Sequence, residues 1–190
     1  TSEPLPSATV FDTLGALVDH SLVQRDDLAD EAAEPRFRLL TLIREYALER
    51  LEERSEGESL RARHAAYFAA LAEESAPHLI SGTELAWQRR LLAEEENLRA
   101  ALRWASEVGD PDLGLRLGGA LGHYWTMRGA YREGRAWLAP WLDHTADVAP
   151  SARRALALHS ASVLSWRLGA YGEAQRYGEA GLAAYRALGD

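Results

Sequence analysis

The sequence predicts a mostly α-helical protein, in which an array of paired helices follows a short segment with one β-hairpin. Alanine and leucine supply 64 of the 190 residues, whereas valine, isoleucine and threonine together supply 15. Alanine and leucine favour helices, and β-branched residues favour strands. A short motif also recurs 40 residues apart, which is typical of stacked helical hairpins.

The first 55 residues contain the only segment that favours strands. We expect a short helix over 10–18, and then two strands that pair as a hairpin, over 22–25 and 36–40, around an acidic loop. Thr41 is expected to cap a helix over 42–54, and Gly57 to mark its end. These features define one predicted unit, residues 1–55.

Residues 56–190 are predicted to form a second unit made only of helices. Apolar residues recur every three or four positions, and Gly or Pro separates the runs. The expected helices span 59–75, 83–108, 111–128, a segment from Tyr131 onward, 151–168 and 171–188.

Two stretches within this second unit resemble each other. Residues 129–134 read Gly-Ala-Tyr-Arg-Glu-Gly, and residues 169–174 read Gly-Ala-Tyr-Gly-Glu-Ala. Each pair of helices around such a turn resembles the tetratricopeptide repeat, with a period of 40 instead of about 34 residues. The resemblance implies an α-solenoid of TPR-like helical hairpins, in which the glycine ends one helix with a positive φ.

The repeat pattern also predicts a groove, because the first helices of successive hairpins line one concave face. Such a face would suit a peptide or a small ligand. The candidate groove residues are Arg116, His123, Thr126, Met127, His159, Val163, Trp166 and Arg167. At the last helix, we expect an exposed apolar end face at Tyr177, Gly181 and Leu188.

The composition argues against catalysis. The chain has no cysteine and no lysine, so disulfides, thiolate zinc sites and Schiff-base lysines are absent. No two of the six histidines are three or four residues apart, so no helical metal site is expected. The acidic run 94–96 is interpreted as a solvated helix face in which Glu95 pairs with Arg99. We therefore predict no catalytic residue, no metal and no cofactor in this chain.

The chain is also predicted to be soluble and cytoplasmic, without membrane contact. No run of about 18 apolar residues and no signal-peptide pattern is present. The net charge is −8, and residues 1–55 hold 12 acidic residues against 6 arginines. Because DNA binding depends on positive charge, direct DNA contact is not expected.

A wider resemblance covers most of the chain. The segments that carry it are 17–23, 35–40, 43–51, 61–68 and 96–104. They resemble the end of the winged-helix module, and the helices after it, in bacterial signal-transduction ATPases with numerous domains (STAND ATPases, of the NB-ARC type). The resemblance implies a partial winged helix, and a nucleotide-binding domain elsewhere in the parent protein that would bind ATP or ADP with Mg²⁺. Many members of this family are transcriptional regulators.

The resemblance implies a sensor arm: a protein or small effector binds the helical repeats, and the signal passes to the nucleotide-binding domain. One alternative is a free-standing TPR-like adaptor that binds a peptide of a partner protein. A weaker alternative is DNA binding by the winged-helix piece.

Overall fold

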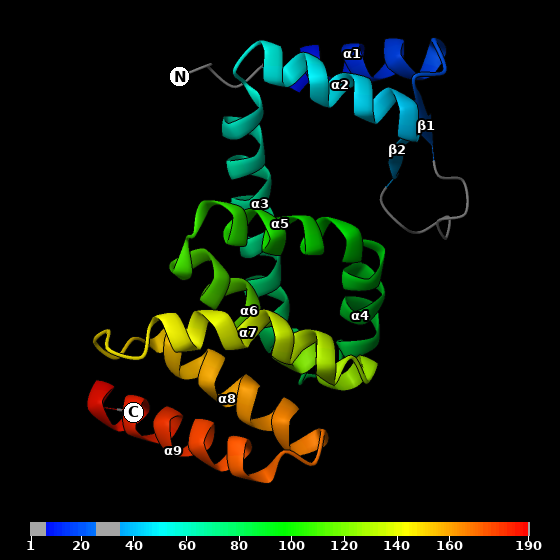
Figure 1. Cartoon of the computed structure of the whole chain (residues 1–190). Helices are drawn as coiled ribbons and strands as arrows, with labels where there is room; N and C mark the ends of the chain where they lie inside the picture. Colours follow the sequence, from blue (N-terminus) through cyan, green and yellow to red (C-terminus); the bar gives the residue numbers. More distant parts are fainter. Residues whose placement is uncertain (1–6, 26–34, 190) are drawn as a thin grey trace. The chain divides into compact units, whose positions relative to one another are not determined.

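The structure is a computed structural model that describes residues 7–25 and 35–189. The chain divides into two compact units, residues 1–58 and 59–190. Helices dominate both, so the predicted mostly α fold is confirmed (Figure 1).

The first unit contains the predicted β-hairpin. Strands β1 (Val23–Arg25) and β2 (Phe37–Leu39) pair antiparallel, with Val23 opposite Leu39. Helix α1 (Ser7–Asp19) precedes the hairpin, and α2 (Thr41–Glu53) follows it. The predicted acidic loop, except for its last residue, lies outside the described residues.

Both predictions about the ends of α2 are wrong. Leu40 has an extended backbone (φ −61°, ψ 146°) and holds the N-cap position, so Thr41 is already helical and no side chain caps the helix. After α2, Ser55 takes a positive φ of 56°, and the Glu56 amide donates to the Leu51 carbonyl. This turn ends α2 before Gly57, which instead begins the next helix.

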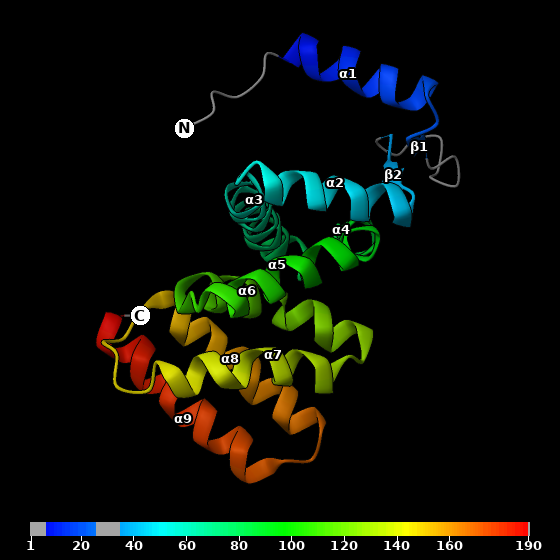
Figure 2. The same cartoon turned by 45° about the horizontal axis from the view of Figure 1, so that its top comes forward.

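Seven helices follow one another over the described residues 57–189, and the first of them begins two residues before the second unit does. They are α3 (Gly57–His78), α4 (Glu84–Ala93), α5 (Glu95–Val108), α6 (Pro111–Arg128), α7 (Tyr131–His144), α8 (Ala152–Arg167) and α9 (Tyr171–Leu188). Helices α6 and α7 form one hairpin and α8 and α9 another, and α8 packs against both α6 and α7 (Figures 1 and 2).

The long helix expected over 83–108 is two helices. The chain bends at Glu94, whose φ of −101° and ψ of 6° separate α4 from α5. The Asn97 side-chain amide donates to the Glu94 carboxylate at 2.7 Å, which supports the bend. Leu91 on α4 and Leu98 on α5 are both buried, so tertiary packing determines the break where no Gly or Pro marks it.

Helix α3 is longer than the predicted helix over 59–75. It continues past Pro77 to His78. Within α3, Phe68 and Leu71 are buried, whereas Leu60 and Tyr67 are exposed. The small residues Ala65, Ala69 and Ala72 complete the buried side, which lets neighbouring helices approach closely.

The repeat turns are as predicted. Gly129 and Gly169 have φ values of 70° and 75° and end α6 and α8. A Cβ added to Gly134 would lie 2.6 Å from a Trp125 ring atom, so the second helix of this hairpin needs glycine at that position. Ser151 caps α8, because its hydroxyl accepts a hydrogen bond from the Arg154 amide.

Candidate functional site

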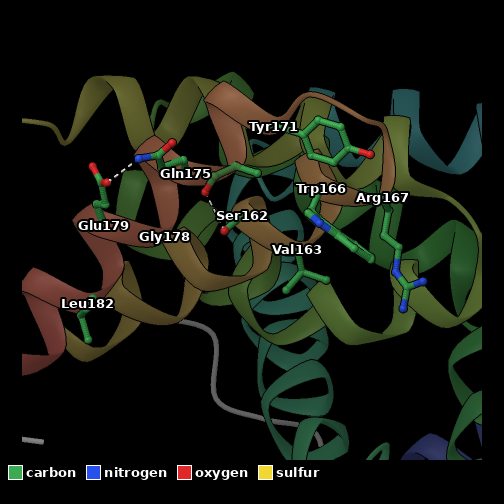
Figure 3. A pocket seen from close by; sticks show the side chains of 10 residues that line it. Ser162, Val163, Trp166, Arg167, Tyr171, Gln175, Gly178, Glu179 and Leu182 are labelled. Atoms are coloured by element: carbon green, nitrogen blue, oxygen red, sulfur yellow. Dashed lines mark hydrogen bonds between the residues drawn. The ribbon is translucent and has the colours of Figure 1, made fainter.

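A cavity of about 610 Å³ opens between α8 and α9. Three predicted groove residues, Val163, Trp166 and Arg167, lie on its α8 side (Figure 3). The α8/α9 surface, as we call it, consists of Ser162, Val163, Trp166, Arg167, Tyr171, Ala174, Gln175, Gly178, Glu179 and Leu182.

The lining is mostly apolar, with polar groups toward its ends. Trp166 is 56% exposed, and the Arg167 guanidinium carbon lies 5.3 Å from the centre of its ring. Figure 3 shows Arg167 and Glu179 on opposite sides of the lining. The Gln175 amide donates to the Glu179 carboxylate at 2.8 Å. Such a surface can bind an apolar group and orient it through charges at the rim.

The other five groove candidates do not line this cavity. His123 on α6 and His159 on α8 are exposed. Met127 accepts a hydrogen bond at its Sδ from the Gln88 amide of α4, at 3.1 Å. That contact ties α6 to α4.

Arg116 and Thr126 make structural contacts. Arg116 donates to both carboxylate oxygens of Glu73 on α3, at 2.8 and 2.7 Å. This hydrogen bond lowers the pKa of Glu73 below its usual value. The Thr126 hydroxyl donates to the Gly122 carbonyl within α6.

Seven lining residues, Ser162 on α8 and six on α9, were not predicted from the sequence as groove residues. The repeat pattern assigned ligand contacts to first helices, whereas α9 is a second helix. The signal for them was the pair Ala174 and Gly178, small residues one turn apart that leave a hollow between larger neighbours.

The predicted end face is wrong. Tyr177 and Gly181 are buried, and the space that a Gly181 Cβ would take faces Leu158 of α8. The regular apolar stripe of α9 therefore marks the side packed within its own hairpin. Leu188 alone of the three is exposed.

Ion pairs link α5 to α7 and α7 to α9. Arg99 of α5 donates to Glu133 of α7 at 2.7 Å, and also pairs with Glu95, as predicted, at 3.0 Å. Arg135 of α7 pairs with Glu173 of α9 at 3.0 Å. The hydrogen bond from Arg99 lowers the pKa of Glu133 below its usual value. Glu133 and Glu173 hold the same repeat position, so one contact type recurs along the stack.

Within residues 7–25 and 35–189, no three His, Asp or Glu side chains gather as metal ligands would. In the same part of the chain, no helix is long and apolar enough to span a membrane.

Comparison with known proteins shows similarity of this chain to a domain family and to parts of longer proteins. Residues 5–52 match the family model of a winged helix-turn-helix domain. The chain is 34% identical to proteins of Mycobacterium bovis and Mycobacterium tuberculosis that are named HTH-type transcriptional regulators. The alignment covers 165 residues, 83% of the chain. The chain spans 18% of the length of these relatives. No solved structure matches.

The first unit therefore resembles a winged helix-turn-helix domain, and the chain is similar to part of transcriptional regulators. The match to a winged helix-turn-helix domain runs against the expectation, drawn from charge, that this unit makes no direct DNA contact. The acidic balance of residues 1–55 is still unfavourable for attraction to phosphates, so such contact would depend on local arginines.

Proposed function

We propose that the chain is the non-catalytic interaction arm of a STAND-type transcriptional regulator. A protein or small effector binds the helical array, and the winged-helix unit passes the signal to a nucleotide-binding domain of the parent polypeptide. ATP or ADP with Mg²⁺ would bind in that domain. The relay is a two-state contact whose equilibrium the effector shifts.

The observation that carries this proposal is the exposed apolar face of α2. Among its described residues, α2 buries none. Leu42 is 78% exposed and Tyr46, one turn later, is 60% exposed. Adjacent exposed apolar side chains mark a contact surface. Similarity to regulators several times longer than the matched segment supports a contact with another domain of the same protein.

A free-standing TPR-like adaptor is the alternative supported by the cavity. Its partner would be a peptide with an apolar side chain, because the lining is mostly apolar. In that case the α2 face would have no regulatory role, so substitutions on that face separate the two functions.

In the native-length protein, we expect the double substitution Leu42→Glu with Tyr46→Glu to raise transcription without effector. We propose that the contact of α2 with the nucleotide-binding domain keeps the regulator inactive, and two charges on the α2 face would disfavour that contact. Allosteric couplings of this kind change equilibria by roughly 5- to 150-fold. Reporter transcription in cells measures the effect. Glu45→Gln, between the two positions on the same helix, is the matched control. Unchanged reporter output in the double variant would contradict the relay.

DNA binding by the first unit is a second candidate, favoured by the winged helix-turn-helix match. Arg36 precedes β2 and Arg38 lies within it, so both belong to the hairpin. If the hairpin contacts phosphates, the double substitution Arg36→Ala with Arg38→Ala should remove two contacts. The slope of log K for duplex binding against log salt concentration should then become shallower by about two. Fluorescence anisotropy measures it, with the exposed Arg132→Ala as control. Absence of any salt-dependent binding would exclude this candidate.

A further inference from the structure

The α8/α9 surface has a counterpart one hairpin earlier, and there it is covered. Because the motif repeats after 40 residues, each lining residue of α9 corresponds to one of α7. Leu182 is 51% exposed, whereas its counterpart Leu142 is 2% exposed. Tyr171 is 66% exposed, whereas Tyr131 packs half-buried against the core. The apolar side of the second helix is thus buried in one hairpin and open in the next.

The element that covers the earlier surface is α8. It packs against α6 and α7, and its Ser160 hydroxyl donates to the Gly119 carbonyl of α6 at 3.1 Å. Leu164 of α8 reaches to 2.9 Å from the place that a Cβ on Gly134 would take. Gly134 corresponds to Ala174, which lines the open cavity. The molecule therefore shows which element binds such a surface: a helix carrying a leucine at this point.

We propose that the α8/α9 surface binds the first helix of a further helical hairpin, contributed by the same polypeptide after Asp190. In the regulator relatives the 165 matched residues make up 18% of the chain, so those proteins are several times longer than the matched segment. Stacked hairpins bury a continuous core only when each is covered by its neighbour. This inference concerns the array itself and does not depend on the effector proposed above.

The shape of the α8/α9 surface indicates which side chains the incoming helix must carry. Gly178 occupies the repeat position that Leu138 holds in α7, so the cavity lacks the leucine side chain that fills this position in the earlier hairpin. The incoming helix should therefore place a bulky apolar residue over Ala174 and Gly178. An acidic residue near Arg167 would complete the contact, since Arg167 is the cation of the rim.

The absence of cysteine allows a direct test by thiol labelling. Leu182→Cys would be made in the 190-residue chain and in the native-length protein, and the rate of its reaction with a maleimide would be followed by mass spectrometry of the labelled peptide. Thiol reactivity depends on exposure. We expect the rate to fall at least about tenfold in the native-length protein, because only transient opening would expose the residue.

The control is Ala183→Cys, one residue further along α9. Ala183 is exposed, and its counterpart Asp143 stays exposed beside the covering α8. Its labelling rate should be equal in both proteins. Equal rates for Leu182→Cys in the two proteins would overturn the proposal, as would a native gene that ends at Asp190. Protection that grows with the concentration of the 190-residue chain would overturn it in favour of a second copy.

Discussion

Replacing Gly122 with alanine is expected to destabilise the second unit by about 3 kcal/mol. Gly122 lies on α6 directly against Ser160 of α8, and an added Cβ would overlap the Ser160 side chain and come within 3.3 Å of its Cα. Ser160 cannot rotate out of the way, because its Cβ is part of the overlap and its hydroxyl is bonded to the Gly119 carbonyl. The two helices must therefore separate, which loosens the core between the hairpins.

Urea denaturation followed by circular dichroism measures the effect. The matched control is Gly172→Ala, on a helix and with nothing within 4 Å of its Cβ position. That change should leave stability equal or raise it by up to about 1 kcal/mol, because glycine is a poor helix former. Adding Ser160→Gly to Gly122→Ala should recover part of the loss, since the overlap disappears. Similar midpoints for Gly122→Ala and Gly172→Ala would contradict the close-packing account.

The repeated turns could be predicted from the sequence because their physical cause is local. A glycine after an amphipathic run supplies the positive φ that ends a helix, and both Gly129 and Gly169 do so. The hairpin of the first unit was predictable for a similar reason, since strand-favouring residues flank one loop. From local sequence patterns of this kind, most helix ends could be predicted to within a few residues.

Features set by tertiary contact were not predictable. The bend at Glu94 has no Gly or Pro, and it follows from burying Leu91 and Leu98 on differently directed helices. The apolar stripe through Tyr177 and Gly181 was interpreted as an end face, yet periodicity gives only the width of a stripe and not the neighbour that covers it. The same ambiguity hid the contribution of α9 to the cavity.

The equivalent residues Leu142 and Leu182 should respond very differently to truncation. We expect Leu142→Ala to cost about 3 kcal/mol of unfolding free energy, within the range for fully buried leucines. Leu182→Ala should change it by less than about 0.5 kcal/mol, because half of that side chain is already in water. Both are leucines at the same position of successive second helices, so sequence context is closely matched. Urea denaturation of the 190-residue chain measures both.

Measuring the unfolding free energies of the same two variants in the native-length protein tests whether a further hairpin covers α9. If a further hairpin covers α9, Leu182→Ala should there become destabilising by about 2 kcal/mol or more, as the residue moves from solvent into a core. The cost of Leu142→Ala should stay the same, since α8 covers it in both proteins. Because each repeat contacts only its neighbours, burial at Leu182 reports on the next hairpin alone. Equal costs for Leu182→Ala in the two proteins would mean that the array ends at α9.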